Sequence, residues 1–132
     1  MGNIDQTLAN QLINAMTTVA ALPALTGPVH CRIMTVNGSA SALGTELATS
    51  GGYTSGTGAP TVGFASAAGS ATNSNTLVSV TNMPAATEVG IETWDSSGTP
   101  RRIWWGPLAA PKTTNAGDTF SILSGQISFS FP

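Results

Sequence analysis

Residues 88–107 constrain the fold more than any other stretch, because two alternating segments flank a cluster of turn-forming residues. The turn, residues 95–100, reads D-S-S-G-T-P, and nearly all of these residue types favour turns. The flanking segments are rich in β-branched and aromatic residues, which suit a half-buried pleated surface. Together they predict a β-hairpin. In the first strand, Val89, Ile91 and Thr93 lie on one face and Glu92 and Trp94 on the other. In the second strand, Ile103 and Trp105 lie on one face and Arg102 and Trp104 on the other.

The long turn leaves the register of this hairpin open. Glu92 and Arg102 occupy positions that allow them to lie close together on one face. An ion pair on an exposed face contributes less than about 1 kcal/mol, so such a pair would inform the orientation of the strands more than their stability.

The scarcity of charge is the strongest clue in the composition. Charged residues make up 8% of the 132 residues, against roughly 25% in an average soluble domain. A free monomer needs surface charge for solubility, whereas a subunit packed among neighbours needs less. The composition therefore favours a component of an assembly, with a secreted Ser/Thr-rich β-domain as the alternative. The length predicts one domain, residues 1–132, that buries a core without metals or disulfides.

Several function classes lack the sequence features that they require. The net charge is −2 and no basic run is present, so the sequence predicts no nucleic-acid partner. A single cysteine, Cys31, excludes an internal disulfide and a cysteine-based metal site. Residues 12–25 are too short and too polar to span a membrane. The first residues have no positive segment of the kind that begins a secretory signal, so we expect the chain to be made in a cytoplasm.

The N-terminal region predicts one amphipathic α-helix, residues 5–21. Asp5 precedes the first periodic apolar residue and suits the N-cap position. Pro23 ends the helix, because proline cannot continue it and disfavours a helical conformation at Leu22. The apolar stripe needs a partner, which is a face or open end of the sheet or a neighbouring subunit. The stripe consists of Leu8, Leu12, Ala15, Met16 and Val19.

Residues 29–132 alternate short apolar segments with turn signals, a pattern typical of an antiparallel β-sandwich of jelly-roll type. We therefore assign the chain to the mainly β class, with one N-terminal α-helix. Residues 37–60 are predicted to form a long glycine-rich loop around a short segment at 45–49. Two further stretches, 67–73 and 107–114, are predicted to be linkers. Residues 115–118 form a turn. Besides the hairpin, the expected strands are 29–36, 60–66, 75–81, 119–123 and 126–131.

The sequence does not predict an enzyme. His30 is the one histidine, no nucleophile elbow accompanies it, and we expect it to make a polar contact on the open face of its strand. No metal-binding spacing surrounds it. Glu88 and Glu92 share a strand face but precede an exposed-looking turn, which argues against a glycosidase pair. The glycines at 51–58 lack the lysine and the helix of a phosphate-binding loop. We therefore expect no catalytic residue, no cofactor and no metal.

The three tryptophans are candidates for a binding surface. Alternation prevents Trp104 and Trp105 from sharing a face, so one belongs to the core and the other is exposed or interfacial. Tryptophan is enriched at interface hot spots, which favours a contact between subunits over a sugar-stacking platform formed with Trp94.

Two stretches carry a resemblance to a known family. G-I-E-T-W-D-S-S-G-T-P-R-R-I-W-W-G-P-L-A-A-P-K-T-T-N-A-G-D-T-F, followed by a strand to the end, resembles the C-terminal half of small virion proteins of tailed phages. The upstream E-L-A-T-S-G-G-Y, residues 46–53, is similar to the E-V-S-G-G-G-Y segment of that family. The family usually has a basic residue after the tyrosine, whereas Thr54 and Ser55 follow here. Members are commonly labelled tail fibre or minor tail proteins, and some decorate the capsid.

The resemblance implies a virion structural role. We expect a capsid decoration (cement) protein on the capsid surface that forms a homotrimer, binds the major capsid protein and is made in the cytoplasm of a bacterial host. The alternative is a tail fibre or tail-tip component that binds a host-surface glycan. The residues expected at an interface are Tyr53, Glu46, Trp94, Trp104, Trp105, Arg101 and Arg102.

The loop 37–60, together with the helix, is expected to contact the partner surface. Ordering the loop costs roughly 1–2 kcal/mol per residue, and the loop has few large apolar groups whose burial could offset this cost. We therefore expect it to be mobile in the free protein and anchored by Tyr53 in the particle. The alternative is a loop that folds back on its own domain.

Overall fold

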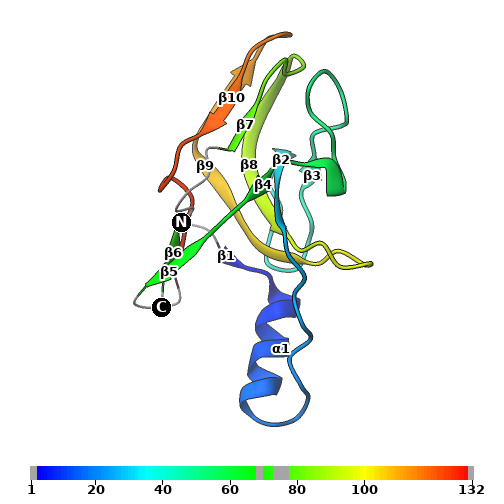
Figure 1. Ribbon diagram of the computed structural model, residues 1–132, viewed down its shortest axis with the longest axis vertical. Coiled ribbons are helices and arrows are strands. Elements are labelled where there is room, and N and C mark those ends of the chain that lie inside the picture. The colour runs from blue at the N-terminus through cyan, green and yellow to red at the C-terminus, as the bar shows by residue number, and fades with distance from the viewer. Residues whose placement is uncertain (1–2, 68–69, 73–77, 131–132) are drawn as a thin grey trace.

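The hairpin lies at the centre of a six-stranded antiparallel sheet in a computed structural model of the chain (Figure 1). The structure describes residues 3–67, 70–72 and 78–130. The strand order is β1-β9-β8-β2-β3, and β4 also pairs with β2. The bounds are β1 (Asn3–Ile4), β9 (Arg102–Thr114), β8 (Ala86–Trp94), β2 (Val29–Val36), β3 (Thr45–Glu46) and β4 (Thr61–Val62).

The predicted hairpin is confirmed, and its register is now defined. Glu92 pairs with Trp105 and Trp94 pairs with Arg102, and the register shifts between Glu88 and Gly90 and again between Thr93 and Trp94. The linker predicted at 107–114 is wrong, because β9 continues to Thr114 and pairs again with the start of β8. Prolines are tolerated there because β1 pairs with β9 only near Trp104 and Trp105, so this part of β9 is an edge of the sheet.

Two smaller antiparallel sheets complete the β structure. One pairs β7 (Val78–Val80) with β10 (Phe120–Ile122), and the other has the order β11-β6-β5, with β11 (Ser128–Ser130), β6 (Ser70–Thr72) and β5 (Ala65–Ala67). Residues 70–72 therefore form a strand where a linker was predicted, because backbone pairing does not require large side chains. The predicted positions 75–77 and 131 lie outside the described residues.

The core lies between the sheets, and its strand residues come from β2, β4, β7, β8, β10 and β11. In β7 and β10 the apolar residues point inward and the serines between them do not, as period-2 alternation requires. The mainly β class with antiparallel sheets and one helix is confirmed, whereas the jelly-roll sandwich stays a prediction. The core cluster contains Cys31, Ile33, Leu47, Tyr53, Ala59, Val62, Val78, Val80, Met83, Ile91, Phe120, Ile122, Ile127 and Phe129.

The helix α1 (Gln6–Met16) is shorter than the predicted 5–21. Asp5 is its N-cap as predicted, since Oδ1 accepts hydrogen bonds from the backbone N–H groups of Thr7 at 2.8 Å and Leu8 at 3.3 Å. The helix stops because the Thr17 hydroxyl bonds to a backbone carbonyl of the last turn and Thr18 has a φ of 59°, which is left-handed. Among the described residues, no helix has the length and hydropathy needed to cross a membrane.

The loop 37–60 folds back on its own sheet, which is the arrangement given above as the alternative to a partner-braced loop. It contains β3 and a short 3-10 turn, η1 (Gly56–Gly58). Leu47, Tyr53 and Ala59 from this segment are buried in the core cluster. These residues supply the apolar contacts that offset the ordering cost within the chain.

Candidate functional site

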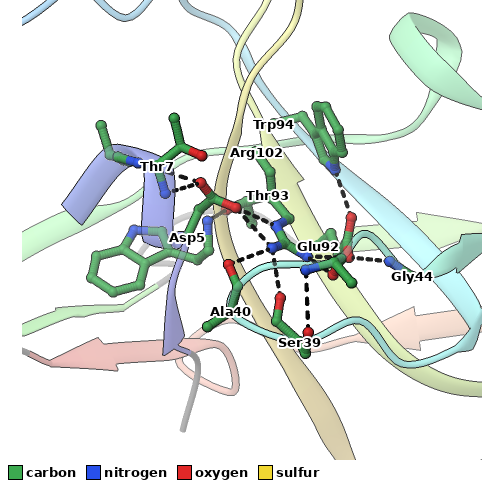
Figure 2. Close-up of polar contacts among 12 residues, drawn as sticks. Asp5, Thr7, Ser39, Ala40, Gly44, Glu92, Thr93, Trp94 and Arg102 are labelled. Carbon is green, nitrogen blue, oxygen red and sulfur yellow. Dashed lines mark hydrogen bonds and ion pairs between the residues drawn. The ribbon is translucent and has the colours of Figure 1, made fainter. Parts of the chain in front are cut away.

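Arg102, at the start of β9, is the centre of a buried polar cluster at the base of the helix (Figure 2). Its Nε donates to Asp5 Oδ2 at 2.9 Å, and its Nη1 donates to Glu92 Oε1 at 2.9 Å. The remaining guanidinium N–H groups donate to backbone carbonyls of Ser39, Ala40 and Ala42. We call Arg102, Asp5 and Glu92 the Arg102 cluster, which joins the helix, the hairpin and the loop after β2.

Glu92 and Arg102 lie close together, as their positions allowed, and the pair is buried, so the estimate for an exposed pair does not apply to it. Each side chain is 2% exposed, because the loop after β2 covers the pair: a Cβ on Gly38 would lie 2.6 Å from Glu92 Oε1. Glu92 also accepts hydrogen bonds from the backbone N–H of Gly44 at 2.8 Å and from the Trp94 indole N–H at 3.1 Å. A buried pair satisfied in this way specifies one arrangement of its neighbours and is costly to break.

Residues 6–28 form a projection that we call the arm. It consists of α1 and the segment that returns to β2, and in Figure 1 it extends away from the sheets. The outgoing side is fixed by the Arg102 cluster and by the N–H of Gln6, which donates to Ala40 O at 3.1 Å. The returning side is fixed by the N–H of Ser96, which donates to Thr26 O at 2.7 Å, and by the Arg101 guanidinium, which donates to Ala24 O.

The apolar stripe becomes more exposed along the helix, since Leu12 and Ala15 are half-buried and the last two members are exposed. Leu8 is the one helix residue that the structure classes as buried, next to the Arg102 cluster. Met16 is 83% exposed, and Val19, which lies beyond the helix, is 74% exposed. The outer part of the stripe therefore does not cover a face of the chain's own sheet, and a neighbouring subunit as its partner stays a prediction.

Little charge remains on the surface of the described residues. Four ion pairs occupy seven of the ten charged side chains, namely Asp5, Glu46, Glu92, Asp95, Arg32, Arg101 and Arg102. Glu88 is fully buried, which leaves Lys112 and Asp118 as the unpaired surface charges. A protein surface with so few unpaired charges provides little electrostatic repulsion to oppose association.

The tryptophans are packed within the chain to different degrees. Trp94 is 9% exposed and lies under the Arg32 guanidinium, whose carbon is 4.0 Å from the ring centroid. Trp104 stacks on Phe129 with a centroid distance of 4.7 Å and an interplanar angle of 8°. Trp105 is half-buried on the opposite face, near Arg102. The prediction that alternation separates Trp104 from Trp105 agrees with these contacts, and Trp105 is the better candidate for an interface.

Tyr53 and Glu46, the loop's two interface candidates, contact each other inside the chain. The Tyr53 hydroxyl donates to Glu46 Oε1 at 2.8 Å and accepts from the backbone N–H of Ile33 at 3.1 Å. Burial raises the pKa of Tyr53 above its ordinary value, and the neighbouring Glu46 raises it further. Tyr53 therefore anchors the loop to β2 as a neutral phenol.

The comparison with known families agrees with the resemblance described above. Residues 3–130 match the model of a family described as "Podophage GP4 fiber I protein gp80". This chain belongs to the fibre I family. No curated protein matches it. The predicted relationship to virion structural proteins of tailed phages is confirmed.

In this fibre I family member, none of the described residues forms a catalytic constellation. His30 Nδ1 lies 2.7 Å from Ala59 O, a polar contact within the chain, although His30 is buried rather than on an open face. Glu88 Oε1 accepts from Thr114 at 2.7 Å while Glu92 binds Arg102, so the two carboxylates act separately. Burial raises the pKa of Cys31 to about 12, so its thiol stays protonated. No group of three or more His, Cys, Asp or Glu in the described part of the chain is placed to hold a metal.

A groove of about 600 Å³ lies between the outer half of β9 and the segment around β10 and β11. Its lining is largely apolar and includes Leu108, Phe120, Ile122, Ile127 and Phe129. Figure 1 places this region away from the arm of the fibre I protein. The groove is thus a second surface feature, separate from the Arg102 cluster.

The hairpin turn of the fibre I protein contains a further buried carboxylate, Asp95. Its Oδ1 accepts from the backbone N–H of Arg101 at 2.7 Å and from the Ser97 hydroxyl at 3.0 Å, and its Oδ2 pairs with the Arg101 guanidinium at 3.1 Å. Burial alone would raise the pKa of Asp95, but these hydrogen bonds outweigh burial and hold the pKa below its ordinary value of 3.8.

The depressed pKa of Asp95 predicts a loss of stability in acid. The contribution of Asp95 is fully present above its unfolded pKa near 3.8 and is lost as the pH falls through the lower folded value. Between about pH 5 and about pH 3, urea unfolding should show a larger fall in the free energy of unfolding for the wild type than for Asp95→Asn. The other carboxylates titrate in both proteins, so equal slopes would contradict the prediction.

Three parts of this site were not predicted from the sequence. Asp5 was assigned only as an N-cap and Asp95 only as a turn residue, and residues 22–28 were not expected to form a surface. The signal for the last was available, since residues 6–28 include no charged residue.

Proposed function

We propose that the protein is a structural subunit of the tail fibre of a podophage virion. The observation that carries this proposal is the family match, which covers residues 3–130 of a 132-residue chain and therefore involves the arm and the sheets together. The family description names a fibre protein, so the tail-fibre alternative is favoured over capsid decoration. The expected major-capsid-protein partner, the capsid-surface location and the homotrimer gain no support from it.

The physical properties of the described residues support a structural rather than a catalytic role. The surface of the described residues carries two unpaired charged side chains, and seven of the charged side chains are used in ion pairs within the chain. Subunits that pack together in a fibre need little surface charge. We propose no cofactor and no reaction for the chain.

The glycan-binding part of the alternative lacks a specific observation in its favour. An aromatic platform for a sugar needs an open ring face beside polar groups. Trp94 and Trp104 are covered by Arg32 and Phe129 respectively, and Trp105 alone is half-buried without a stacking partner ring in the described part of the chain. The proposal is therefore limited to a role in fibre structure.

Immunogold electron microscopy of purified virions tests this proposal. Antibodies raised against the purified chain should label the tail fibres and leave the head unlabelled. Densitometry of the same virions should give a few to a few tens of copies. Labelling distributed over the head, with hundreds of copies, would overturn the fibre assignment.

A further inference from the structure

We propose that the arm, residues 6–28, is a self-association surface whose occupant is the arm of a second copy of this chain. The proposal rests on the proposed structural role, because it names a partner for the subunit. Four independent features of the arm support it: its exposed apolar side chains, their spacing on the helix, its lack of charged residues and its attachment to the hairpin.

The first observation is a concentration of exposed apolar side chains. Of the eight large hydrophobic residues exposed in the described part of the chain, five lie on the arm. They are Ile13 (57% exposed), Met16 (83%), Val19 (74%), Leu22 (42%) and Leu25 (43%). A gathered apolar surface of this kind marks an interaction site rather than ordinary scattered exposure.

The second observation is the spacing on the helix. Ala9, Ile13 and Met16 recur at i, i+4 and i+7, which is the spacing of a helix–helix seam. None of the three is buried in the isolated chain. A small residue followed by two larger ones allows two helices to approach at one end and to interdigitate along the rest.

The third observation indicates what the partner is. The arm has no Asp, Glu, Lys, Arg or His between Gln6 and Pro28. It therefore offers nothing to a charged partner such as a nucleic acid or an anionic lipid surface. In a symmetric contact between identical copies each residue near the axis meets its own equivalent, so any charge there would face a like charge. An uncharged surface is what such a contact requires.

The fourth observation is that the arm is held rigidly. Both of its ends are attached to the hairpin, the outgoing end by Asp5 and Arg102 and the returning end by Ser96 and Arg101. An isolated helix of 11 residues would be marginal in water, but this one is already capped and positioned. A preorganised surface loses less conformational entropy on association.

The size of the arm sets the expected strength. A helix of 11 residues is about 16 Å long and cannot by itself bury the roughly 800 Å² per partner of a standard interface. Val19, Leu22 and Leu25 of the returning segment must therefore contribute. We expect a weak contact in the purified chain, with a Kd on the order of micromolar, which repeated contacts in an assembly would strengthen.

Sedimentation analysis of the purified full chain tests the contact. The 13.3 kDa chain should sediment as a multiple of that mass at about 100 µM and dissociate on dilution. Met16→Glu places one negative charge per copy in the seam and should weaken association at least about tenfold. Met16→Leu keeps the seam apolar and should associate as the wild type does. Circular dichroism and urea unfolding of each variant check that the fold is intact.

Cysteine cross-linking locates the contact. The native Cys31 is 0% exposed, so a cysteine introduced elsewhere reacts alone. Ile13→Cys should give a covalent dimer with a short bis-maleimide, whereas Leu123→Cys, at a site of nearly equal exposure (57% against 56%) beside β10, should not. A monomeric wild type at high concentration would overturn the proposal. So would wild-type association by a folded Met16→Glu variant, or equal cross-linking at both positions.

These measurements separate the two proposals. Self-association of the purified chain does not depend on where it sits in the virion, so head labelling in the immunogold experiment would remove the fibre role and leave the arm contact intact. Conversely, a chain that labels the fibres but stays monomeric through its arm would retain the fibre role and lose this inference.

Discussion

Replacing Arg102 with methionine is expected to lower the free energy of unfolding by about 3–5 kcal/mol. The guanidinium forms ion pairs with both Asp5 and Glu92 and donates to carbonyls of the loop after β2. Methionine fills part of the volume but leaves the buried Glu92 carboxylate without its cation and several carbonyls without a donor. Urea denaturation of the wild type and the variant gives the difference directly.

Lys112→Met is the matched control for this substitution. It removes the same charge from β9, but Lys112 is exposed and belongs to none of the ion pairs. The control should lie within about 0.5 kcal/mol of the wild type. If Arg102→Met were no more destabilising than Lys112→Met, the cluster would not contribute to stability as described.

Replacing Trp104 with alanine is also expected to cost about 3–5 kcal/mol. The indole stacks on Phe129 and packs against the core cluster, so its removal leaves a cavity between β9 and β11. Phe129 also contacts Phe64 at a centroid distance of 5.1 Å, and this pair would lose one wall of its packing. The unfolding midpoint in urea should fall without a change in the number of transitions.

Trp105→Ala is the natural comparison because it removes the same side chain one position later. Both tryptophans are half-buried, but Trp104 packs against the core cluster and Trp105 does not, so at Trp105 we expect a loss below about 2 kcal/mol. Equal losses at the two positions would contradict the assignment of Trp104 to the core. A folded Trp105→Ala variant that fails to assemble would support the predicted interface role of Trp105.

The hairpin was predictable from the sequence because its information is local. Alternation on both sides of a turn-rich segment fixes which residues share a face, and the separation of Trp104 from Trp105 follows from it. Asp5 as an N-cap was predictable for the same reason. Its pairing with Arg102 was not, since the two residues are 97 positions apart and only the tertiary fold brings them together.

Other features were obscured by competing local signals. Pro107 and Pro111 suggested a linker, but a strand edge tolerates proline where no hydrogen-bond donor is needed. The apolar periodicity suggested a helix to residue 21, whereas the hydroxyl of Thr17 and the left-handed Thr18 end it at Met16. The glycine-rich composition of the loop suggested mobility. The burial of Leu47 and Tyr53 was not predictable, because it depends on contacts with residues distant in sequence.

The double attachment of the arm has a mechanical consequence. A pull on the arm is shared between the edge strand β1, which leads into the helix, and the more central strand β2, which follows the returning segment. Contacts near both attachment points link the arm to the hairpin, so the arm cannot swing about a single hinge. Two copies joined through their arms would consequently hold their sheets at a fixed mutual angle, and that angle would be set by how each monomer holds its own arm.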